Sequence, residues 1–223
     1  MKRKVNTGSY VVSSPALGDV DGDGKIEIVV GNMDGFIYCI DGESSEVRWR
    51  AKAGRCIRGS PALGDIDGDG IIEVAVGSMD GFIYCMDGRS GEVRWKEGIN
   101  NNVESSPVLG DIDGDGRAEV VVGSWDGNIY CIDGSVGKVK WKVRTNGLVD
   151  SSPVLGDVDK DGIVEIVSTS RDGWLYLLKV TGGRGQAGEI VWSRWRGDGF
   201  GTGVLENAIS YGEAARRGET NTW

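Results

Sequence analysis

The sequence predicts an all-β protein, a β-propeller built from four four-stranded antiparallel blades. Three observations predict this fold. A unit of 46 residues occurs four times. Each copy holds four short apolar segments separated by turn residues, and no helical periodicity is visible before the C-terminal tail.

The repeat is marked by the four prolines, each within a Ser-Pro-(Ala/Val)-Leu-Gly-Asp segment: Pro15, Pro61, Pro107 and Pro153. A repeat of this length is a supersecondary unit that cannot bury its surfaces alone, so the copies are expected to stack. We therefore divide the chain into an N-terminal extension (1–8), a propeller (9–196, with blades of about 9–54, 55–100, 101–146 and 147–196) and a C-terminal tail (197–223).

The first copy shows the expected elements in order, with strands at Val11–Gly18, Glu27–Gly31, Phe36–Ile40 and Glu46–Arg50. Asp-Gly pairs follow the second and third strands, and glycine there accepts the positive φ that a hairpin needs. The third strand is apolar at every position, which predicts that both of its faces are covered. The fourth strand alternates apolar and charged residues, as an outer edge strand should.

An acidic loop lies between the first and second strands of every copy and reads Asp-x-Asp-Gly-Asp-Gly-x-x-Glu in the first. Its carboxylates are Asp19, Asp21, Asp23 and Glu27; Asp65, Asp67, Asp69 and Glu73; Asp111, Asp113, Asp115 and Glu119; and Asp157, Asp159, Asp161 and Glu165. Four carboxylates in nine residues repel one another unless a cation neutralises them, and an all-oxygen ligand set favours calcium over magnesium. The alternative is a set of solvated Asp-rich turns that bind no ion. The recurrence of the same motif in all four copies argues against this alternative.

The spacing is that of the first half of an EF-hand loop, in which position 7 supplies a backbone carbonyl. Here those carbonyls would belong to Lys25, Ile71, Arg117 and Ile163. Position 12 holds no acid in any copy, so the loops are not EF-hands, and the Glu at position 9 is expected to close each site. The sequence thus predicts up to four calcium ions.

The composition excludes several classes of protein. The net charge of −9 disfavours a nucleic-acid partner, and no apolar run is long enough to span a membrane. Histidine is absent, which removes the commonest zinc ligand and general base. The basic start, Met1 to Lys4, is not followed by an apolar segment, so no signal peptide is visible in this chain.

The acidic motif, followed by an apolar strand and glycine, resembles the FG-GAP and VCBS calcium-binding repeats of propellers. The second half of each copy, Asp34 to Gly42 leading to Trp49 in the first, resembles PQQ-like repeats. That resemblance implies that one tryptophan per copy docks a blade onto the next, namely Trp49, Trp95, Trp141 and Trp192. Some PQQ-like proteins are quinone-dependent dehydrogenases, but this chain offers no non-repeated catalytic set and no adjacent cysteines.

The function predicted is therefore non-enzymatic: a calcium-binding module for binding or adhesion, extracellular or at the cell surface, where weak calcium loops suffice. The alternative is a structural subunit that assembles into a ring or filament through its C-terminal tail, and a quinone-dependent dehydrogenase is a distant third. The partner is expected to be a protein or glycan, or further copies of the chain. An Arg196-Gly197-Asp198 adhesion tripeptide also occurs.

Binding is expected on the side of the blades opposite the acidic loops, because that side varies most between copies. Its candidate residues are Met33, Met79, Trp125, Arg171, Arg58 and Glu104. The alternative is neutral drift at exposed turns. Three cysteines, Cys39, Cys85 and Cys131, share one repeat position that Leu177 fills in the fourth copy, which predicts buried free thiols. Cys56 has no counterpart in the repeat.

Closure of the propeller has two solutions. Four blades can close a ring by packing the fourth blade against the first, or they can form half of an eight-bladed ring made by two chains. The tail carries Leu205, Ile209, Tyr211 and Trp223, so we expect it to pack along its own propeller or to dock on a neighbouring molecule.

Overall fold

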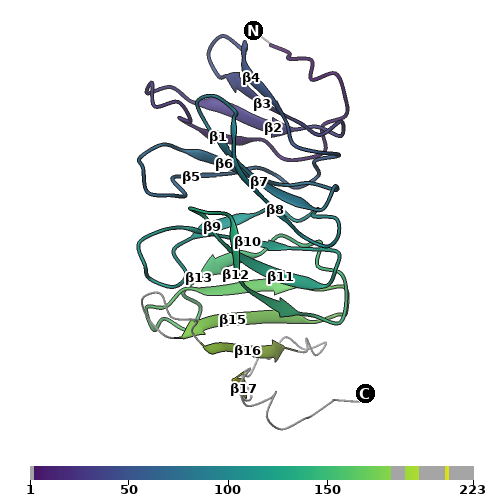
Figure 1. The fold of residues 1–223 in the computed structure, drawn as a ribbon, viewed down its shortest axis with the longest axis vertical. Coiled ribbons are helices and arrows are strands. Elements are labelled where there is room, and N and C mark those ends of the chain that lie inside the picture. Colours follow the sequence, from purple (N-terminus) through teal and green to yellow (C-terminus); the bar gives the residue numbers. More distant parts are fainter. Residues whose placement is uncertain (1–2, 182–188, 196–208, 211–223) are drawn as a thin grey trace.

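The computed structural model describes residues 3–181, 189–195 and 209–210, which hold seventeen strands and no helix. This part of the chain therefore contains no helix that could cross a membrane. The strands form four antiparallel sheets in chain order (Figure 1).

The first sheet contains β1 (Ala16–Gly18), β2 (Glu27–Gly31), β3 (Phe36–Asp41) and β4 (Val47–Lys52), and the second contains β5 (Ala62–Gly64), β6 (Glu73–Gly77), β7 (Phe82–Asp87) and β8 (Val93–Gly98). The third contains β9 (Val108–Gly110), β10 (Glu119–Gly123), β11 (Asn128–Asp133) and β12 (Lys138–Arg144), and the fourth contains β13 (Val154–Gly156), β14 (Glu165–Thr169), β15 (Leu175–Thr181), β16 (Glu189–Trp195) and β17 (Ile209–Ser210).

The strand patterns match the expectation for propeller blades. The central strands β2, β3, β6, β7, β10 and β11 are buried almost throughout, because each sheet is covered by the next. The outer strand β4 is exposed or half-buried along its length. The Asp-Gly turn between β2 and β3 is confirmed, with φ of +77° at Gly35, a value that glycine adopts without strain.

The first strand is shorter than predicted. We expected Val11–Gly18, whereas β1 covers only Ala16–Gly18. Pro15 has no amide hydrogen, and the two serines before it bond elsewhere. The Ser13 hydroxyl donates to the Gly31 carbonyl, and the Ser14 N–H donates to Ser60 Oγ of the second sheet.

The core lies between the sheets. Three buried clusters each combine side chains of two neighbouring sheets, such as Ile37 and Cys39 of the first with Val76 and Met86 of the second. The tryptophan docking implied by the PQQ-like resemblance is seen at all three junctions, where Trp49, Trp95 and Trp141 pack against the buried clusters, whereas the side chain of Trp192 lies outside the described part of the structure. Trp49 Nε1 donates to the Gly88 carbonyl (2.7 Å) and Trp95 Nε1 to the Gly134 carbonyl (2.6 Å).

The four sheets form an open series and not a closed ring. Figure 1 shows the first sheet at one end of the stack and the fourth at the other. The innermost strands contact one another in the order β1–β5–β9–β13. The expectation that the fourth blade packs against the first of the same chain is therefore wrong. Each sheet takes its four main strands from one continuous copy, and no strand of the described residues links the two ends.

The tail and the cysteines can be followed in part. Ile209–Ser210 pairs with β16 and adds a strand to the chain's own fourth sheet, as we expected of a tail that packs on its propeller. The Arg196-Gly197-Asp198 tripeptide and Trp223 lie outside the described residues. All four cysteines are free, and Cys39, Cys85 and Cys131 are buried as predicted.

Candidate metal sites

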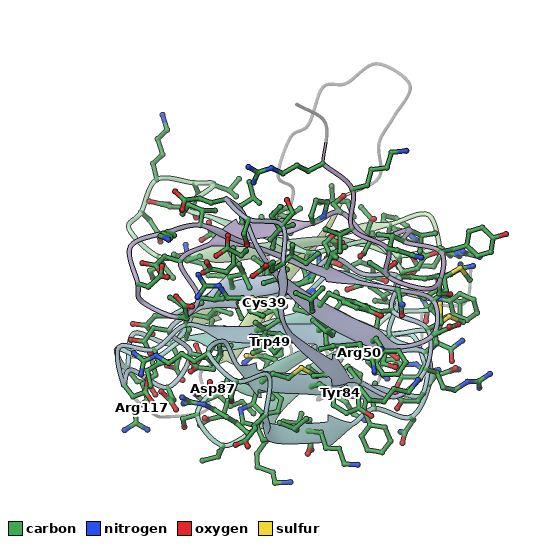
Figure 2. The ribbon with its side chains drawn as sticks, turned by 90° about the horizontal axis from the view of Figure 1, so that it is seen from above. Cys39, Trp49, Arg50, Tyr84, Asp87 and Arg117 are labelled. Atoms are coloured by element: carbon green, nitrogen blue, oxygen red, sulfur yellow. The ribbon has the colours of Figure 1, made fainter. Side chains whose placement is uncertain are left out.

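The four acidic loops lie on one side of the stacked sheets, where each connects the innermost strand to the second. The turn between the third and fourth strands lies on the same side, since Gly42 N–H of that turn donates to the Ile26 carbonyl beside the acidic loop. Looking along the stack, Figure 2 places Asp87 and Arg117 toward this side and Arg50 and Tyr84 toward the other.

Each loop folds around the carboxylate of its first aspartate. Asp19 accepts hydrogen bonds from the N–H groups of Gly22 (2.8 Å) and Gly24 (2.9 Å), and both glycines have positive φ. The same bond to the position-6 glycine recurs from Asp65, Asp111 and Asp157. The sequence thus bends the loop inward at the positions that only glycine fills without strain.

The glutamate at position 9 is the buried end of each loop. Its side chain is at most 2% exposed in all four copies: Glu27, Glu73, Glu119 and Glu165. One carboxylate oxygen accepts the N–H of the residue after the first aspartate, as in Val20 N to Glu27 Oε2 (3.1 Å). The other oxygen of Glu27, Glu73 and Glu165 is buried and accepts no hydrogen bond of normal geometry, but it lies 2.9–3.5 Å from the nitrogen of an arginine or lysine. Burial raises the pKa of Glu27, Glu73 and Glu119.

The structure brings three carboxylates together in every loop, with one oxygen from each lying within 4.8 Å of the others. The groups are Asp19, Asp21 and Glu27; Asp65, Asp67 and Glu73; Asp111, Asp113 and Asp115; and Asp157, Asp159 and Glu165. The remaining predicted carboxylates, Asp23, Asp69, Glu119 and Asp161, lie outside these groups. At position 7, the N–H groups of Lys25, Ile71, Arg117 and Ile163 donate to the position-5 aspartates. Their role as carbonyl ligands stays a prediction.

One basic side chain enters each acidic group, a feature that our sequence reasoning missed. The residues are Arg48, Arg94, Lys140 and Lys179. Arg94 is typical: its Nη1 lies 2.6 Å from Asp67 Oδ2 and 3.1 Å from Glu73 Oε1, and its Nη2 lies 3.0 Å from Asp87 Oδ2. Each loop therefore holds an internal cation that neutralises part of its charge.

The repeat contained a signal for these cations. Arg48, Arg94 and Lys140 occupy the same position of the outer strand, directly before the docking tryptophan. In the fourth sheet the cation comes instead from β15, where Lys179 replaces the aspartate found at Asp133 and its equivalents. The fourth copy therefore carries its basic residue on β15 and not on the outer strand, and this residue still contacts the glutamate of its loop.

The opposite side carries the residues predicted to bind a partner. Arg58 and Glu104 form an ion pair (3.3 Å) between neighbouring copies. The Arg171 guanidinium lies 5.8 Å from the centre of the Trp125 ring and 2.5 Å from Asp150 Oδ2. Met33 and Met79 occupy the equivalent turns of the first two sheets, and their N–H groups bond to the carbonyls of the incoming linkers.

Comparison with known proteins supports the fold. A family model described as the lambda-carrageenase beta-propeller domain matches residues 89–155. None of the curated proteins matches the chain. Among solved structures, BamB from Moraxella catarrhalis is 20% identical with a TM-score of 0.59, covering 84% of this chain and 62% of BamB.

Two further structures are similar. BBS1N, solved in complex with ARL6DN and soaked with lead, is 16% identical with a TM-score of 0.57 and covers 82% of this chain and 55% of its own. The computationally designed Ika4 protein is 17% identical with a TM-score of 0.60 and covers 79% of this chain and 98% of its own. The chain spans less than two thirds of BamB and BBS1N. These likenesses show a β-propeller fold.

Proposed function

We propose that the chain is a non-enzymatic, calcium-binding propeller module that presents a recognition surface to a protein or glycan partner. The observation that carries the proposal is the group of three carboxylates that each loop brings within 4.8 Å of one another around a single Arg or Lys. One basic side chain carries one positive charge, so the group keeps a net negative charge, and an uncompensated charge near buried Glu27, Glu73 or Glu165 costs free energy. A hard cation would compensate that charge, and all-oxygen groups of this charge suit Ca²⁺.

The ion would be held by the three grouped carboxylates of each loop, and it would supply structural stabilisation. Calcium and the internal Arg or Lys both neutralise the same carboxylates, so they compete. That competition weakens binding, and loops without a bidentate ligand at position 12 belong to the class of sites with dissociation constants of about 10⁻⁴–10⁻³ M. Sites of that strength fill where calcium is abundant, which favours an extracellular or cell-surface location.

The calcium proposal is tested by titrating the full chain with Ca²⁺ and with Mg²⁺ in a calorimeter. We expect up to four calcium ions per chain and much weaker heat with magnesium. Asp67→Asn should remove one site, whereas Glu92→Gln, an exposed acid outside the loops, should leave the stoichiometry unchanged. No calcium binding at millimolar concentration, or equal loss in both variants, would refute the proposal.

The partner side is proposed from the contrast between the two ends of the blades. The acidic loops repeat nearly unchanged, whereas the opposite turns carry different residues in each sheet, including the stacked pair Trp125 and Arg171. Cation–π pairs are attractive, and tryptophan and arginine are enriched among the residues that dominate binding energy at protein interfaces. The matched family model comes from an enzyme named for a glycan, and BBS1N was solved with a protein partner; both kinds of partner therefore remain in the proposal.

The proposal that the partner is a glycan can be tested with λ-carrageenan and with neutral agarose oligosaccharides. If a glycan binds this side, intrinsic tryptophan fluorescence of the chain should change on titration, and Trp125→Ala should abolish the change. Arg144→Ala, which removes a guanidinium from the outer strand of the same sheet, is the control. Release of reducing ends during incubation would contradict the non-enzymatic assignment.

A further inference from the structure

The three junctions between neighbouring sheets repeat one set of contacts. A leucine of each following sheet lies against a glycine of the sheet before it, at Gly18/Leu63, Gly64/Leu109 and Gly110/Leu155. A β-carbon added to Gly64 would lie 2.9 Å from Leu109 Cδ1, so the leucine side chain would have to shift to make room for it. A serine N–H also donates to the next serine hydroxyl, from Ser14 to Ser60, Ser60 to Ser106 and Ser106 to Ser152.

Among the described residues, the two ends of the stack carry the two halves of this contact without a partner. On the first sheet Leu17 is 66% exposed, although its counterparts are packed. On the fourth sheet the matching Gly156 has no atom within 4 Å of where its β-carbon would lie. One end therefore presents an exposed leucine, and the other presents a glycine with open space beside it.

A second contact between neighbouring sheets, in which an aliphatic residue packs against a glycine, also lacks its counterpart at the two ends of the stack in the described part of the chain. Val20 and Ile66 are buried against the glycines of the next sheet, Gly88 and Gly134. Their counterpart in the fourth sheet, Val158, is 55% exposed. The corresponding Gly42 of the first sheet is exposed as well.

The outward face of the fourth sheet is apolar and partly open. Val167, Leu175 and Leu177 are half-buried, whereas their counterparts in the third sheet, Val121, Ile129 and Cys131, are at most 1% exposed. This difference exists because those third-sheet residues are covered by the fourth sheet. The fourth sheet thus ends in a surface built to be covered by another blade.

We propose that a second copy of this chain docks its first sheet onto this fourth sheet, and that two open arcs of four sheets close one ring of eight. The joint would continue the existing series, with Leu17 of one copy against Gly156 of the other and Val158 against Gly42. Eight blades lie within the usual range for propellers. A head-to-tail contact closes a ring when its rotation allows, and two copies would then form two identical joints.

The joint between copies is smaller than the joints within the chain. Thr169 stands where Gly31, Gly77 and Gly123 receive an aliphatic side chain, so that contact is lost. The outer half of the first sheet is also covered, because Val5 packs near Tyr38 and the Thr7 carbonyl accepts the Tyr38 hydroxyl (2.7 Å). Docking therefore centres on the inner rim and the acidic-loop side, and the two-chain ring should dissociate on dilution.

The test is light scattering and analytical ultracentrifugation of the full chain over a range of concentrations. The mass should rise from one chain to two. Leu17→Arg and Gly156→Arg should each raise the dissociation constant by about tenfold or more, because each would bury an unpaired charge in the joint. Val136→Arg is the matched control: Val136 is 58% exposed on a turn away from both ends, so this variant should associate like the wild type.

Mixing the two variants separates head-to-tail docking from any symmetric contact. Leu17→Arg keeps an intact fourth sheet and Gly156→Arg keeps an intact first sheet, so the mixture should regain a one-to-one complex joined once. Circular dichroism should show unchanged folding of both variants, since neither site is packed in the single chain. A mass of one chain at every concentration, or association that neither variant weakens, would overturn the proposal.

Discussion

Replacing Arg94 with methionine should test how charge is balanced in the acidic loops. The change keeps much of the aliphatic stem and removes the guanidinium that contacts Asp67, Asp69, Glu73 and Asp87. Glu73 is only 1% exposed, so it would be left as a buried carboxylate without its cation.

The burial of Glu73 sets the expected loss in the free energy of unfolding. Removing one partner of a buried ion pair costs about 3–5 kcal/mol. Arg94 keeps 24% of its side chain in contact with solvent, which places the expected loss near the lower end, at about 3 kcal/mol without calcium. For a domain of this size the loss corresponds to a fall in Tm of about 6–12 °C.

Calcium should change the result if it binds the same carboxylates. An ion at ten times its dissociation constant stabilises the native state by about 1.4 kcal/mol, and the variant's site should bind it more tightly because the competing guanidinium is gone. Thermal unfolding with excess chelator and with millimolar calcium measures both conditions. Lys96→Met removes an exposed charge from the same strand and should cost under about 1 kcal/mol. Equal destabilisation by Arg94→Met with and without calcium would refute the shared-site reasoning.

Three other predictions concern the sheets themselves. Gly123→Ala would force a β-carbon onto Val149 of the next copy and should cost about 1–3 kcal/mol in urea unfolding, whereas Gly156→Ala, which has open space beside it in the single chain, should be neutral for the unfolding of the dilute single chain. Burial opposes ionisation of Asp172, but a tyrosine hydroxyl and two backbone N–H groups outweigh it and hold the pKa of Asp172 below its ordinary value. Its stabilisation is therefore present above about pH 4 and lost as the pH falls through the folded-state pKa, and Asp172→Asn should flatten this part of the acid unfolding curve. Burial raises the pKa of Cys39 to about 12, so alkylation followed by mass spectrometry should modify Cys39 only after unfolding and the half-buried Cys56 earlier.

The sequence by itself determined the local structure of this protein. The 46-residue period fixes the copies, the apolar pattern fixes which strands are covered on both faces, and the glycines of each acidic loop fix its inward fold around Asp19 and its equivalents. These features depend on residues close together in the chain, so spacing alone predicts them. The free state of the cysteines followed in the same way, because leucine occupies the fourth copy's position.

Only the tertiary structure decided which charges meet and where the series ends. The contact of Arg48 with Asp21 crosses from the outer strand to the first loop, and the transfer of that role to Lys179 in the fourth sheet depends on how β15 lies beside the loop. Closure is a property of the angle between sheets, which no single copy encodes. The same repeat could close at four blades or remain an open arc, and the exposed Leu17 at one end and empty Gly156 at the other exist because the arc stays open.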